Sequence, residues 1–349
     1  MAKIAIIGPS EKYASGIANY TWRLGGELQA YPILYWNMLP KFLFPGATRA
    51  GKVDSRISYS SYVSLDWYNP LTWIRAIREI RRTDLFIVEW WSCSVAHMLL
   101  FICLLSGRRF VIEAHEVLDP LEQKSVLLNV YGRLTRRILF SKASAIVVHN
   151  HTDLLLISNK YKNVSVIPHA VYDQFDKSKP KEWTGAFNVL FFGLIREYKG
   201  IDVLIKAFNQ LEHTDKRLII VGENWDKIPI PEQIDIYYAN KYVSDNETEW
   251  FFQQADVLVL PYTRGSASGV AAIGIHYGLP IIASRVDGIY EQLYDYEGVM
   301  WIDPGDDFGL TQWLYSVALD NRKKRYNVPE RLQWTTIKRQ WEELCQNLK

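Results

Sequence analysis

The sequence predicts an α/β fold made of two doubly wound domains in tandem, and three observations predict it. Short apolar runs alternate with longer amphipathic segments, which indicates parallel strands joined by helices. This alternation stops once, in the polar segment 172–187, and then starts again. The chain has 349 residues, a length that fits two domains, each with a core of its own.

The first half of the chain contains short runs rich in Val and Ile, which are typical of strands buried on both faces. The strands that we expect there lie at 3–8, 84–90, 109–116, 144–150 and 164–170. Amphipathic periodicity predicts helices at 70–82 and 122–142. The aromatic stretch 31–39, "YPILYWNML", shows neither pattern, so we expect a long loop there.

The second half repeats the pattern after the polar linker at 172–187. The strands that we expect there lie at 188–193, 217–222, 256–262, 280–284 and 298–303. The tail from 329 reads as one amphipathic helix, because its large apolar side chains fall on one stripe. The members of this stripe are Leu332, Trp334, Ile337, Trp341, Leu344 and Leu348.

Composition excludes several classes of protein. The net charge of +2 gives no reason to expect a nucleic-acid partner. The three cysteines, Cys93, Cys103 and Cys345, have no metal-ligand spacing and suit a reducing compartment. The longest apolar run, 95–105, is too short to span a bilayer, and the N-terminus does not resemble a signal peptide. We therefore expect a cytoplasmic protein.

A basic and aromatic segment follows the stretch at 31–39. Together with the stretch at 31–39, Lys41, Phe42 and Phe44 could form a lip that inserts into a membrane surface. The other interpretation is that these side chains are simply packed. The sequence alone leaves both open.

Doubly wound sheets bind ligands at the carboxyl ends of their strands, so the loops after each strand hold the candidate site residues. After the first strand, Ser15 and Gly16 begin an apparent helix. Small residues at a helix start expose backbone N–H groups to an anion, although an ordinary strand–helix turn looks the same. The dinucleotide fingerprint G-x-G-x-x-G is absent.

The segment 191–208, "FFGLIREYKGIDVLIKAF", carries the sharpest signal. A strand ends at Gly193, and Arg196 and Lys199 follow directly. Two fixed cations at a strand end suit a diphosphate, since Arg contacts two oxygens and Lys adds a point charge. A solvated loop with routine charges is the alternative.

His115 ends a predicted strand in "IEAHE", where an imidazole could hydrogen-bond a sugar hydroxyl or stabilise developing charge. A structural histidine at a strand end is the alternative. The letters "HNH" at 149–151 match a nuclease motif, but that motif belongs to a different fold. We therefore expect no metal there.

Taken together, the motifs resemble a GT-B glycosyltransferase of the retaining family 4, also described as glycosyl transferases group 1. Five segments carry the resemblance, in the family's order along nearly the whole chain. They are "SGIANYT", "IEAHE", "VIPHAVYDQF", the segment 191–208 and "DVLVLPYTRGSASGVAAIGIHYGLPIIAS". The last two are the most specific.

The resemblance implies a nucleotide-sugar donor held mainly by the second domain. Arg196 and Lys199 would hold its diphosphate and stabilise the leaving group, so no metal or other cofactor is expected. Gly16 would contact the phosphates or sugar, and His115 the transferred sugar. The base would lie against the main chain near Tyr242 and Val243.

The resemblance also sets the expected domain limits. The first, acceptor-side domain would comprise 1–171 and the donor domain 172–329. The final helix, 330–349, would cross back onto the first domain.

The chain departs from many family members between the last predicted strands. The family's Glu-x7-Glu pair falls on Gly265 and Ile273, so both carboxylates are missing. The residues that remain before the next helix are Ser266, Ser268, Gly269 and Val270. Ser268 could cap that helix and leave free N–H groups for a phosphate. A plain cap beneath a broken site is the alternative.

The hypothesis from sequence is therefore sugar transfer from a nucleotide diphosphate sugar, UDP-linked in the first instance, to a hydroxyl acceptor. The acceptor could be a lipid-linked saccharide of exopolysaccharide or capsule synthesis. Two rivals remain. One is a nucleotide-sugar epimerase of the same fold, and the other is a nucleotide-sugar binder without catalysis, which the missing carboxylates favour.

Overall fold

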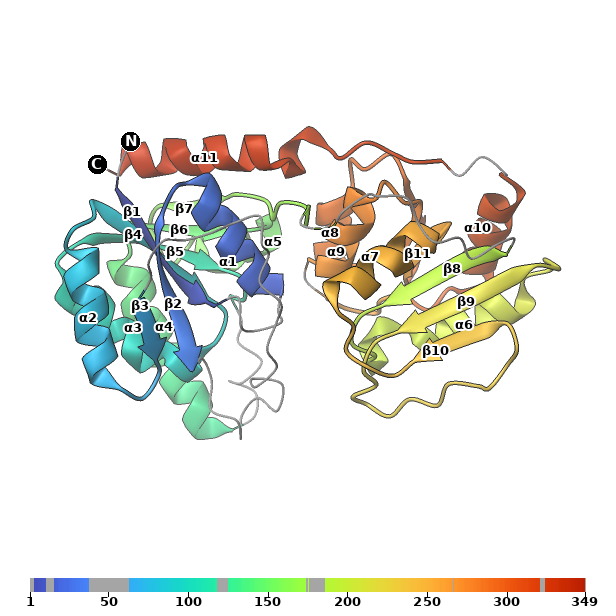
Figure 1. Ribbon diagram of the computed structural model, residues 1–349, viewed down its shortest axis with the longest axis horizontal. Helices are drawn as coiled ribbons and strands as arrows, with labels where there is room; N and C mark the ends of the chain where they lie inside the picture. The colour runs from blue at the N-terminus through green and yellow to red at the C-terminus, as the bar shows by residue number, and fades with distance from the viewer. Residues whose placement is uncertain are drawn as a thin grey trace. The chain divides into compact units, whose positions relative to one another are not determined.

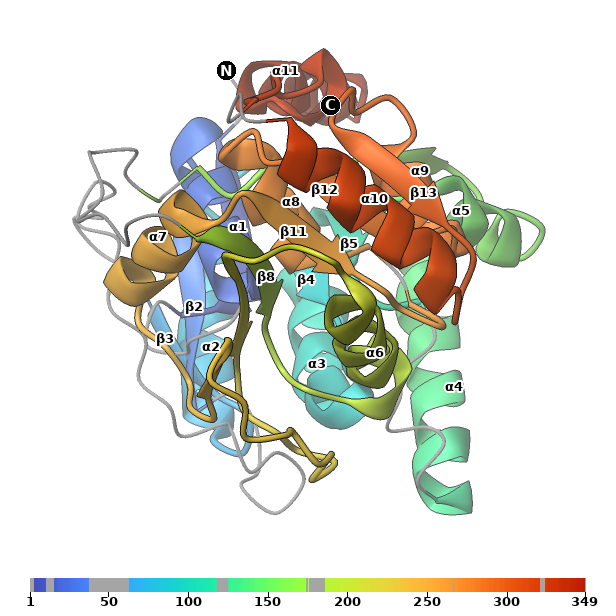
Figure 2. The ribbon, with the colours of Figure 1, turned by 90° about the vertical axis from the view of Figure 1, so that its right-hand side faces the viewer.

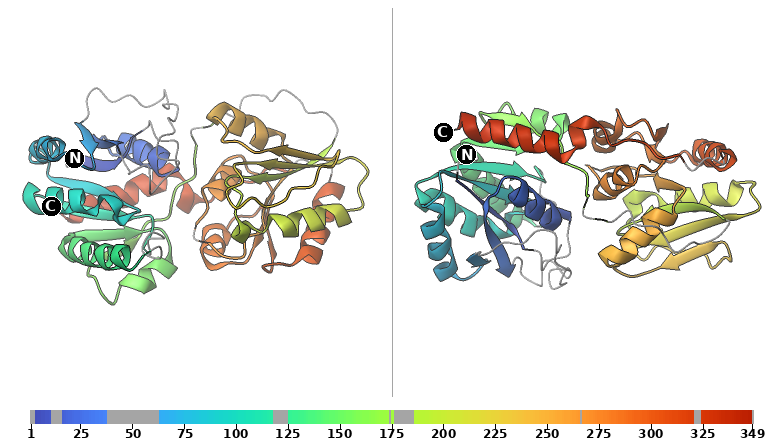
Figure 3. Two further views of the ribbon diagram at one scale, coloured as in Figure 1. Left: turned by 90° about the horizontal axis from the view of Figure 1, so that it is seen from below. Right: turned by 45° about the horizontal axis from the view of Figure 1, so that its top comes forward.

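The structure is a computed structural model that describes residues 3–10, 16–37, 63–117, 125–173, 175, 186–265, 267–320 and 324–348. The chain divides into two compact units, Met1–His169 with Trp334–Lys349 and Ala170–Gln333. Each unit contains one parallel sheet with helices on both faces (Figures 1 and 3). Five residues singled out above, Ser15, Lys41, Phe42, Phe44 and Ser266, lie outside the described residues.

The first unit has a sheet in the order β3-β2-β1-β4-β5-β6-β7. Its strands are β1 (Ile4–Pro9), β2 (Tyr31–Asn37), β3 (Val63–Asp66), β4 (Leu85–Trp90), β5 (Arg109–Ala114), β6 (Ala145–Val148) and β7 (Val164–Val166). The five strands expected from apolar runs all form. The strand order reverses between β1 and β4, which makes this the topological switch point of the sheet.

The helices of the first unit are α1 (Gly16–Glu27), α2 (Pro70–Ile80), α3 (Ala96–Ser106), α4 (Val126–Lys142), α5 (His151–Ile157) and the single turn η1 (Cys93–Val95). Several of them, α2, α4 and α5, begin after a residue whose side chain caps them. Asn69 accepts a hydrogen bond from the start of α2, and Ser125 does the same for α4. The helices expected at 70–82 and 122–142 are therefore confirmed for their described parts.

The loop expected at 31–39 is wrong, because Tyr31–Asn37 forms β2. Pro32 lacks a backbone N–H and argued against a strand. However, β2 pairs with β1 over five residues and has only the short β3 beyond it. Two strands, β3 and β10, were not expected either. Each lies at the edge of its sheet, is mostly only partly buried and lacks a run rich in Val and Ile.

The second unit has a sheet in the order β10-β9-β8-β11-β12-β13. Its strands are β8 (Phe187–Phe192), β9 (Lys216–Val221), β10 (Ile236–Ala239), β11 (Val257–Leu260), β12 (Ile281–Ser284) and β13 (Val299–Ile302). Its helices are α6 (Ile201–Gln210), α7 (Asp245–Gln254), α8 (Gly269–His276), α9 (Asp287–Leu293) and α10 (Asp307–Leu319), with single turns η3 (Glu197–Lys199) and η4 (Glu330–Leu332). The switch point lies between β8 and β11.

The C-terminal helix α11 (Trp334–Asn347) belongs to the first unit, as the resemblance implied. It contacts α1, and the ring of Trp334 lies 5.4 Å from that of Tyr20, centroid to centroid. The helix starts later than expected. Gln333 is extended, with φ −78 and ψ 141, so it separates the turn η4 from α11 and leaves Leu332 in the second unit.

Candidate functional site

The switch point of the second unit gathers several of the predicted site residues. Gly193 follows β8 and has φ +95, a conformation that glycine adopts without strain. A Cβ atom at this position would lie 3.1 Å from Val270 Cγ2 and 3.3 Å from Lys199 Nζ. Glycine therefore lets the end of β8, the turn η3 and the start of α8 approach one another.

The Lys199 ammonium lies at the centre of this group. The side chain is only 8% exposed, and Nζ lies 5.2 Å from the centroid of the Tyr262 ring. Among the described residues, no carboxylate comes within ion-pair distance of it. A nearly buried cation without a counter-charge is costly, so this place favours an anionic ligand.

Arg196 points to different neighbours, although it belongs to the same turn. Its Nε donates to Asp226 Oδ2 at 3.0 Å, and the guanidinium lies 5.7 Å from the centroid of the Trp225 ring. The Glu197 backbone N–H also donates to Asp226, at 2.9 Å, and these bonds lower the pKa of the Asp226 carboxyl. Asp226 accepts from Nε, and the terminal nitrogens of Arg196 have no hydrogen bond to the described residues.

The start of α8 is held by a side chain that sequence reasoning did not single out. Ser268 Oγ accepts from Ala271 N–H at 3.4 Å and caps the helix. Gln292 accepts from Ser268 N–H at 2.7 Å and donates back to Ser268 O at 3.0 Å. The first N–H groups of a helix have no partner within it, which applies here to Gly269 and Val270.

The other predicted donor residues lie elsewhere in their units. Tyr242, half exposed, and the buried Val243 follow β10, the edge strand of the second sheet. Gly16 is the first residue of α1 in the first unit. Ile273, which stands where many relatives have a carboxylate, is buried in α8.

The switch point of the first unit holds buried acids instead of cations. Glu89 on β4 and Glu113 on β5 are register partners, and neither is exposed. Gly8 on β1 faces them, since a Cβ there would lie 2.8 Å from Glu89 Cγ. Burial raises the pKa of Glu89 to about 8, and burial together with the charge of Glu89 raises the pKa of Glu113.

His115 joins these acids to a second histidine. Its Nε2 is hydrogen-bonded to Glu89 Oε2, and its Nδ1 lies 3.2 Å from His149 Nε2. His149 Nδ1 lies 2.9 Å from Ile167 O, and a carbonyl only accepts, so this nitrogen carries a proton. If Glu89 is protonated, the chain of hydrogen bonds runs in one direction. Glu89 donates to His115 Nε2, His115 Nδ1 donates to His149 Nε2, and His149 Nδ1 donates to Ile167 O.

The same side chains are the residues that could hold a metal by geometry. Ligand atoms of Glu113, His115 and His149 all lie within 4.8 Å of one another. Burial lowers the pKa of both histidines, which keeps them neutral. The hydrogen-bond chain already provides a partner for each imidazole nitrogen, so these contacts do not require an ion.

Sequence reasoning missed Glu89, His149, Asp226 and Gln292 as parts of the two clusters. One signal was available for Glu89, because an acid inside the apolar run "LFIVEW" is unusual unless it is paired. Asp226 and Gln292 lie on segments whose approach to Arg196 and Ser268 only the fold creates.

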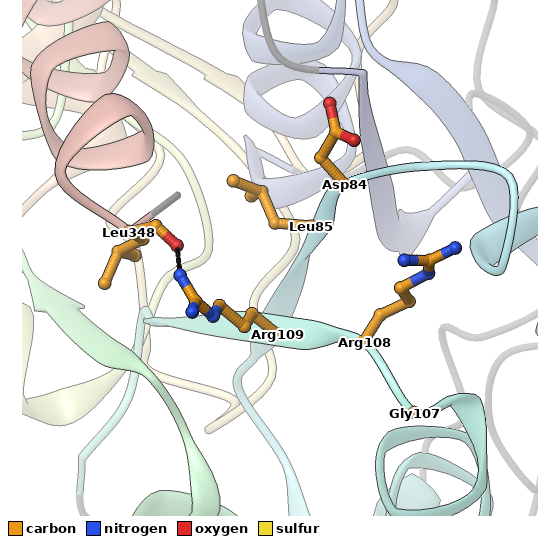
Figure 4. Close-up of a pocket in the computed structure, with 6 residues that line it drawn as sticks. All are labelled: Asp84, Leu85, Gly107, Arg108, Arg109 and Leu348. Atoms are coloured by element: carbon orange, nitrogen blue, oxygen red, sulfur yellow. Dashed lines mark hydrogen bonds between the residues drawn. The ribbon is translucent and has the colours of Figure 1, made fainter.

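A pocket of about 420 Å³ lies elsewhere in the first unit (Figure 4). Its lining residues are Asp84, Leu85, Gly107, Arg108, Arg109 and Leu348, and Arg109 donates to the backbone oxygen of Leu348. β4 and β5 begin at Leu85 and Arg109, so the pocket lies at the amino ends of the strands. Ligands of doubly wound sheets bind at the opposite edge.

Comparison with known proteins finds a family match within the second unit. The family described as Glycosyl transferases group 1 matches residues 186–318, which run from β8 to the last turns of α10. This part of the second unit is therefore similar to group 1 glycosyltransferases. The switch-point residues Gly193, Lys199 and Val270 all lie within the matched part of this unit.

Curated relatives carry glycosyltransferase names. The chain is 22% identical over 279 residues to a D-inositol 3-phosphate glycosyltransferase of Arthrobacter sp. (strain FB24), covering 74% of this chain and 62% of the relative. It is 25% identical over 201 residues to a GDP-mannose:glycolipid 4-beta-D-mannosyltransferase of Xanthomonas campestris pv. campestris, covering 54% of each. The matches thus span less than two thirds of either relative.

Solved structures establish the fold of the whole chain. HepE of Anabaena, in complex with UDP-glucose, matches with a TM-score of 0.68 and 14% identity over 99% of this chain and 100% of that one. A sucrose-phosphate synthase from Thermosynechococcus elongatus matches with a TM-score of 0.64 and 15% identity, covering 100% and 99%. The fold is that of GT-B glycosyltransferases. Among its described helices, none has the length and apolar character needed to cross a bilayer.

Proposed function

We propose that the protein transfers a sugar from a nucleotide diphosphate sugar to a hydroxyl acceptor and retains the anomeric configuration. The observation that carries this proposal is the Lys199 ammonium, which lies nearly buried at the switch point of a unit similar to group 1 glycosyltransferases, without a carboxylate partner among the described residues. A diphosphate is the anion that such a unit would place there.

In the proposed reaction, the bond between the anomeric carbon and the diphosphate oxygen breaks. A new bond to the acceptor oxygen forms on the same face of the sugar, and the proton of the acceptor hydroxyl passes to the leaving diphosphate. The diphosphate leaves with additional negative charge, which Lys199, Arg196 and the N–H groups at the start of α8 would stabilise. Because protein cations take this role, we expect the step to need no metal.

Several residues keep the roles predicted from sequence as part of this proposal. The base would lie near Tyr242 and Val243, and Gly16 would contact the donor from the first unit. His115 would contact the transferred sugar. Both nitrogens of His115 have partners inside the first unit, so that contact requires the exchange of one of these hydrogen bonds.

UDP is the nucleotide that we propose first, because the similar HepE structure contains UDP-glucose. The mannosyltransferase relative is named for GDP-mannose and a glycolipid. That name makes GDP the competing nucleotide and supports a lipid-linked acceptor. With such an acceptor, the protein would act at the inner face of the membrane in polysaccharide synthesis.

The test is calorimetric titration with UDP, UDP-sugars and GDP. We expect saturable binding of the UDP ligands that Lys199→Ala weakens at least tenfold. Lys206→Ala is the matched control, because Lys206 is an exposed lysine of the same unit, paired with Asp307 at 2.8 Å. Absence of nucleotide binding, or equal binding by the two variants, would contradict the proposal.

One observation favours a second candidate, a nucleotide-sugar binder without catalysis. Gly265 and Ile273 replace the two carboxylates, and the buried Ile273 cannot reach a ribose through a hydrogen bond. Incubation of the protein with UDP-sugar alone distinguishes the two. Slow release of free sugar, lost in Arg196→Ala, supports the transferase, whereas tight binding without turnover supports the binder.

A further inference from the structure

Helix α4 has an exposed apolar face that the core of the first unit does not use. Val126, Leu127, Val130 and Leu134 are 80, 82, 60 and 57% exposed. Leu127 precedes Val130 by three residues, and Val126 and Val130 precede Val130 and Leu134 by four each, so the four side chains lie on one side of the helix. The opposite side, with Gly132, Thr135, Leu139 and Phe140, is buried.

The charge of α4 has one sign. The helix contains Arg133, Arg136, Arg137 and Lys142, and no Asp or Glu. Arg133 and Arg137 are exposed and lie within the apolar face, because they follow Val130 and Leu134 by three residues each. We define the α4 face as Val126, Leu127, Val130, Leu134, Arg133 and Arg137. Aliphatic side chains interleaved with arginines are typical of helices that lie in a membrane interface.

The position of α4 leaves this face open. The helix contacts α3 and η1 on its buried side. It has 17 residues, a length of about 25 Å, whereas its neighbour α3 has 11. In Figures 1 and 2, one end of α4 extends beyond the neighbouring elements of its unit.

The topology places the apolar end of the face at the functional edge of the sheet. α4 connects the parallel strands β5 and β6, so it starts at the carboxyl edge and runs back to the amino edge. Val126, Leu127 and Val130 belong to its first turns. They therefore lie at the edge that carries His115, at which an acceptor would be held in the proposed function.

We propose that the α4 face docks the protein on an anionic lipid bilayer, with Leu127 and Leu134 inserted and Arg133 and Arg137 against the headgroups. A second copy of the chain is a poorer occupant, because two α4 faces packed together would bring arginine against arginine. The inference extends the membrane contact in the proposed function, and its test does not use sugar transfer.

The test is co-sedimentation with phosphatidylcholine vesicles, with and without phosphatidylglycerol. We expect binding only to the anionic vesicles, and less of it as the salt concentration rises. Leu127→Glu combined with Leu134→Glu should reduce binding at least about tenfold, since each leucine then loses its apolar insertion. Arg133→Gln with Arg137→Gln should reduce it about fivefold per arginine.

Leu155→Glu is the matched control, because Leu155 is 72% exposed on α5 of the same unit but lies outside the α4 face. It should bind vesicles like the wild type. Equal binding by Leu155→Glu and the double leucine variant would overturn the proposal. So would a native dimer that the double variant dissociates in size-exclusion chromatography, since the occupant would then be a second copy.

A second measurement avoids charge reversal. Leu127→Cys can be labelled with a polarity-sensitive fluorophore, because the three native cysteines are buried. Anionic vesicles should shift its emission to the blue, and phosphatidylcholine alone should not. Unchanged emission with intact UDP binding would refute the membrane face while leaving the donor site standing.

Discussion

The carboxyl edges of the two sheets occupy the same place in their topologies and carry opposite chemistry. In the second unit, Lys199 is a nearly buried cation without a carboxylate partner among the described residues. In the first unit, Glu89 and Glu113 are buried acids. Glu89 is hydrogen-bonded to His115, and Glu113 Oε1 lies 3.7 Å from His149 Nε2. Two sheets with related strand order have therefore acquired different electrostatic tasks.

The difference shows what each edge lacks. The second cluster has positive charge and backbone N–H groups to spare, so an anionic ligand would complete it. Burial favours the uncharged forms in the first cluster, because it raises the pKa of Glu89 to about 8 and lowers that of the histidines. The hydrogen bonds of the first cluster fix the ring of His115, whereas the second cluster would bind an anionic ligand.

The largest effect should come from Arg196, because its loss removes positive charge from the carboxyl edge of the second sheet. Arg196→Ala should lower kcat for sugar transfer by roughly 10²–10³, as expected for loss of one group that stabilises developing charge. Folding should be nearly unchanged, since the side chain is 38% exposed and its bond to Asp226 lies at the surface. Single-turnover kinetics and thermal unfolding measure the two. A variant that stays folded and transfers sugar at the wild-type rate would contradict this assignment.

An intermediate effect should come from Glu89 in the first unit, through the pH dependence of the free energy of unfolding. Burial raises the pKa of Glu89 to about 8 in the folded state, whereas an unfolded glutamate ionises near its ordinary pKa of 4.5. The folded state then binds more protons, so stability falls as the pH rises between these values. Glu89→Gln should remove a decline on the order of a few kcal/mol. Urea unfolding at pH 5 and pH 8 tests this, and an identical pH slope in both proteins would refute it.

The smallest effect should come from the cap of α8. Ser268→Ala removes the hydroxyl that accepts from Ala271 N–H and should cost about 1 kcal/mol of stability. Ser125→Ala, which removes the cap of α4, is the equivalent change in the first unit. Urea unfolding compares the two variants. If nucleotide affinity also falls only in Ser268→Ala, the helix start belongs to the anion site as well as to the fold.

Much of the fold could be predicted from sequence because buried parallel strands are continuous apolar runs. All ten strands expected from such runs formed, as β1, β4 to β9 and β11 to β13. The misses have a physical cause. Pro32 made β2 look unlike a strand. β3 and β10 are mostly only partly buried edge strands without a run rich in Val and Ile.

The candidate site divides in the same way. The sequence by itself determined which residues follow the strands, because Gly193, Lys199 and Ser268 are local to their own loops. It also determined that Gly265 and Ile273 carry no carboxylate. Only the tertiary structure decided which residues contact the site residues. Lys199 meets Tyr262, Arg196 meets Asp226, and Glu89 meets His115 across gaps of at least 26 positions. Local patterns report burial and turn chemistry, whereas charge pairing depends on which strands lie side by side.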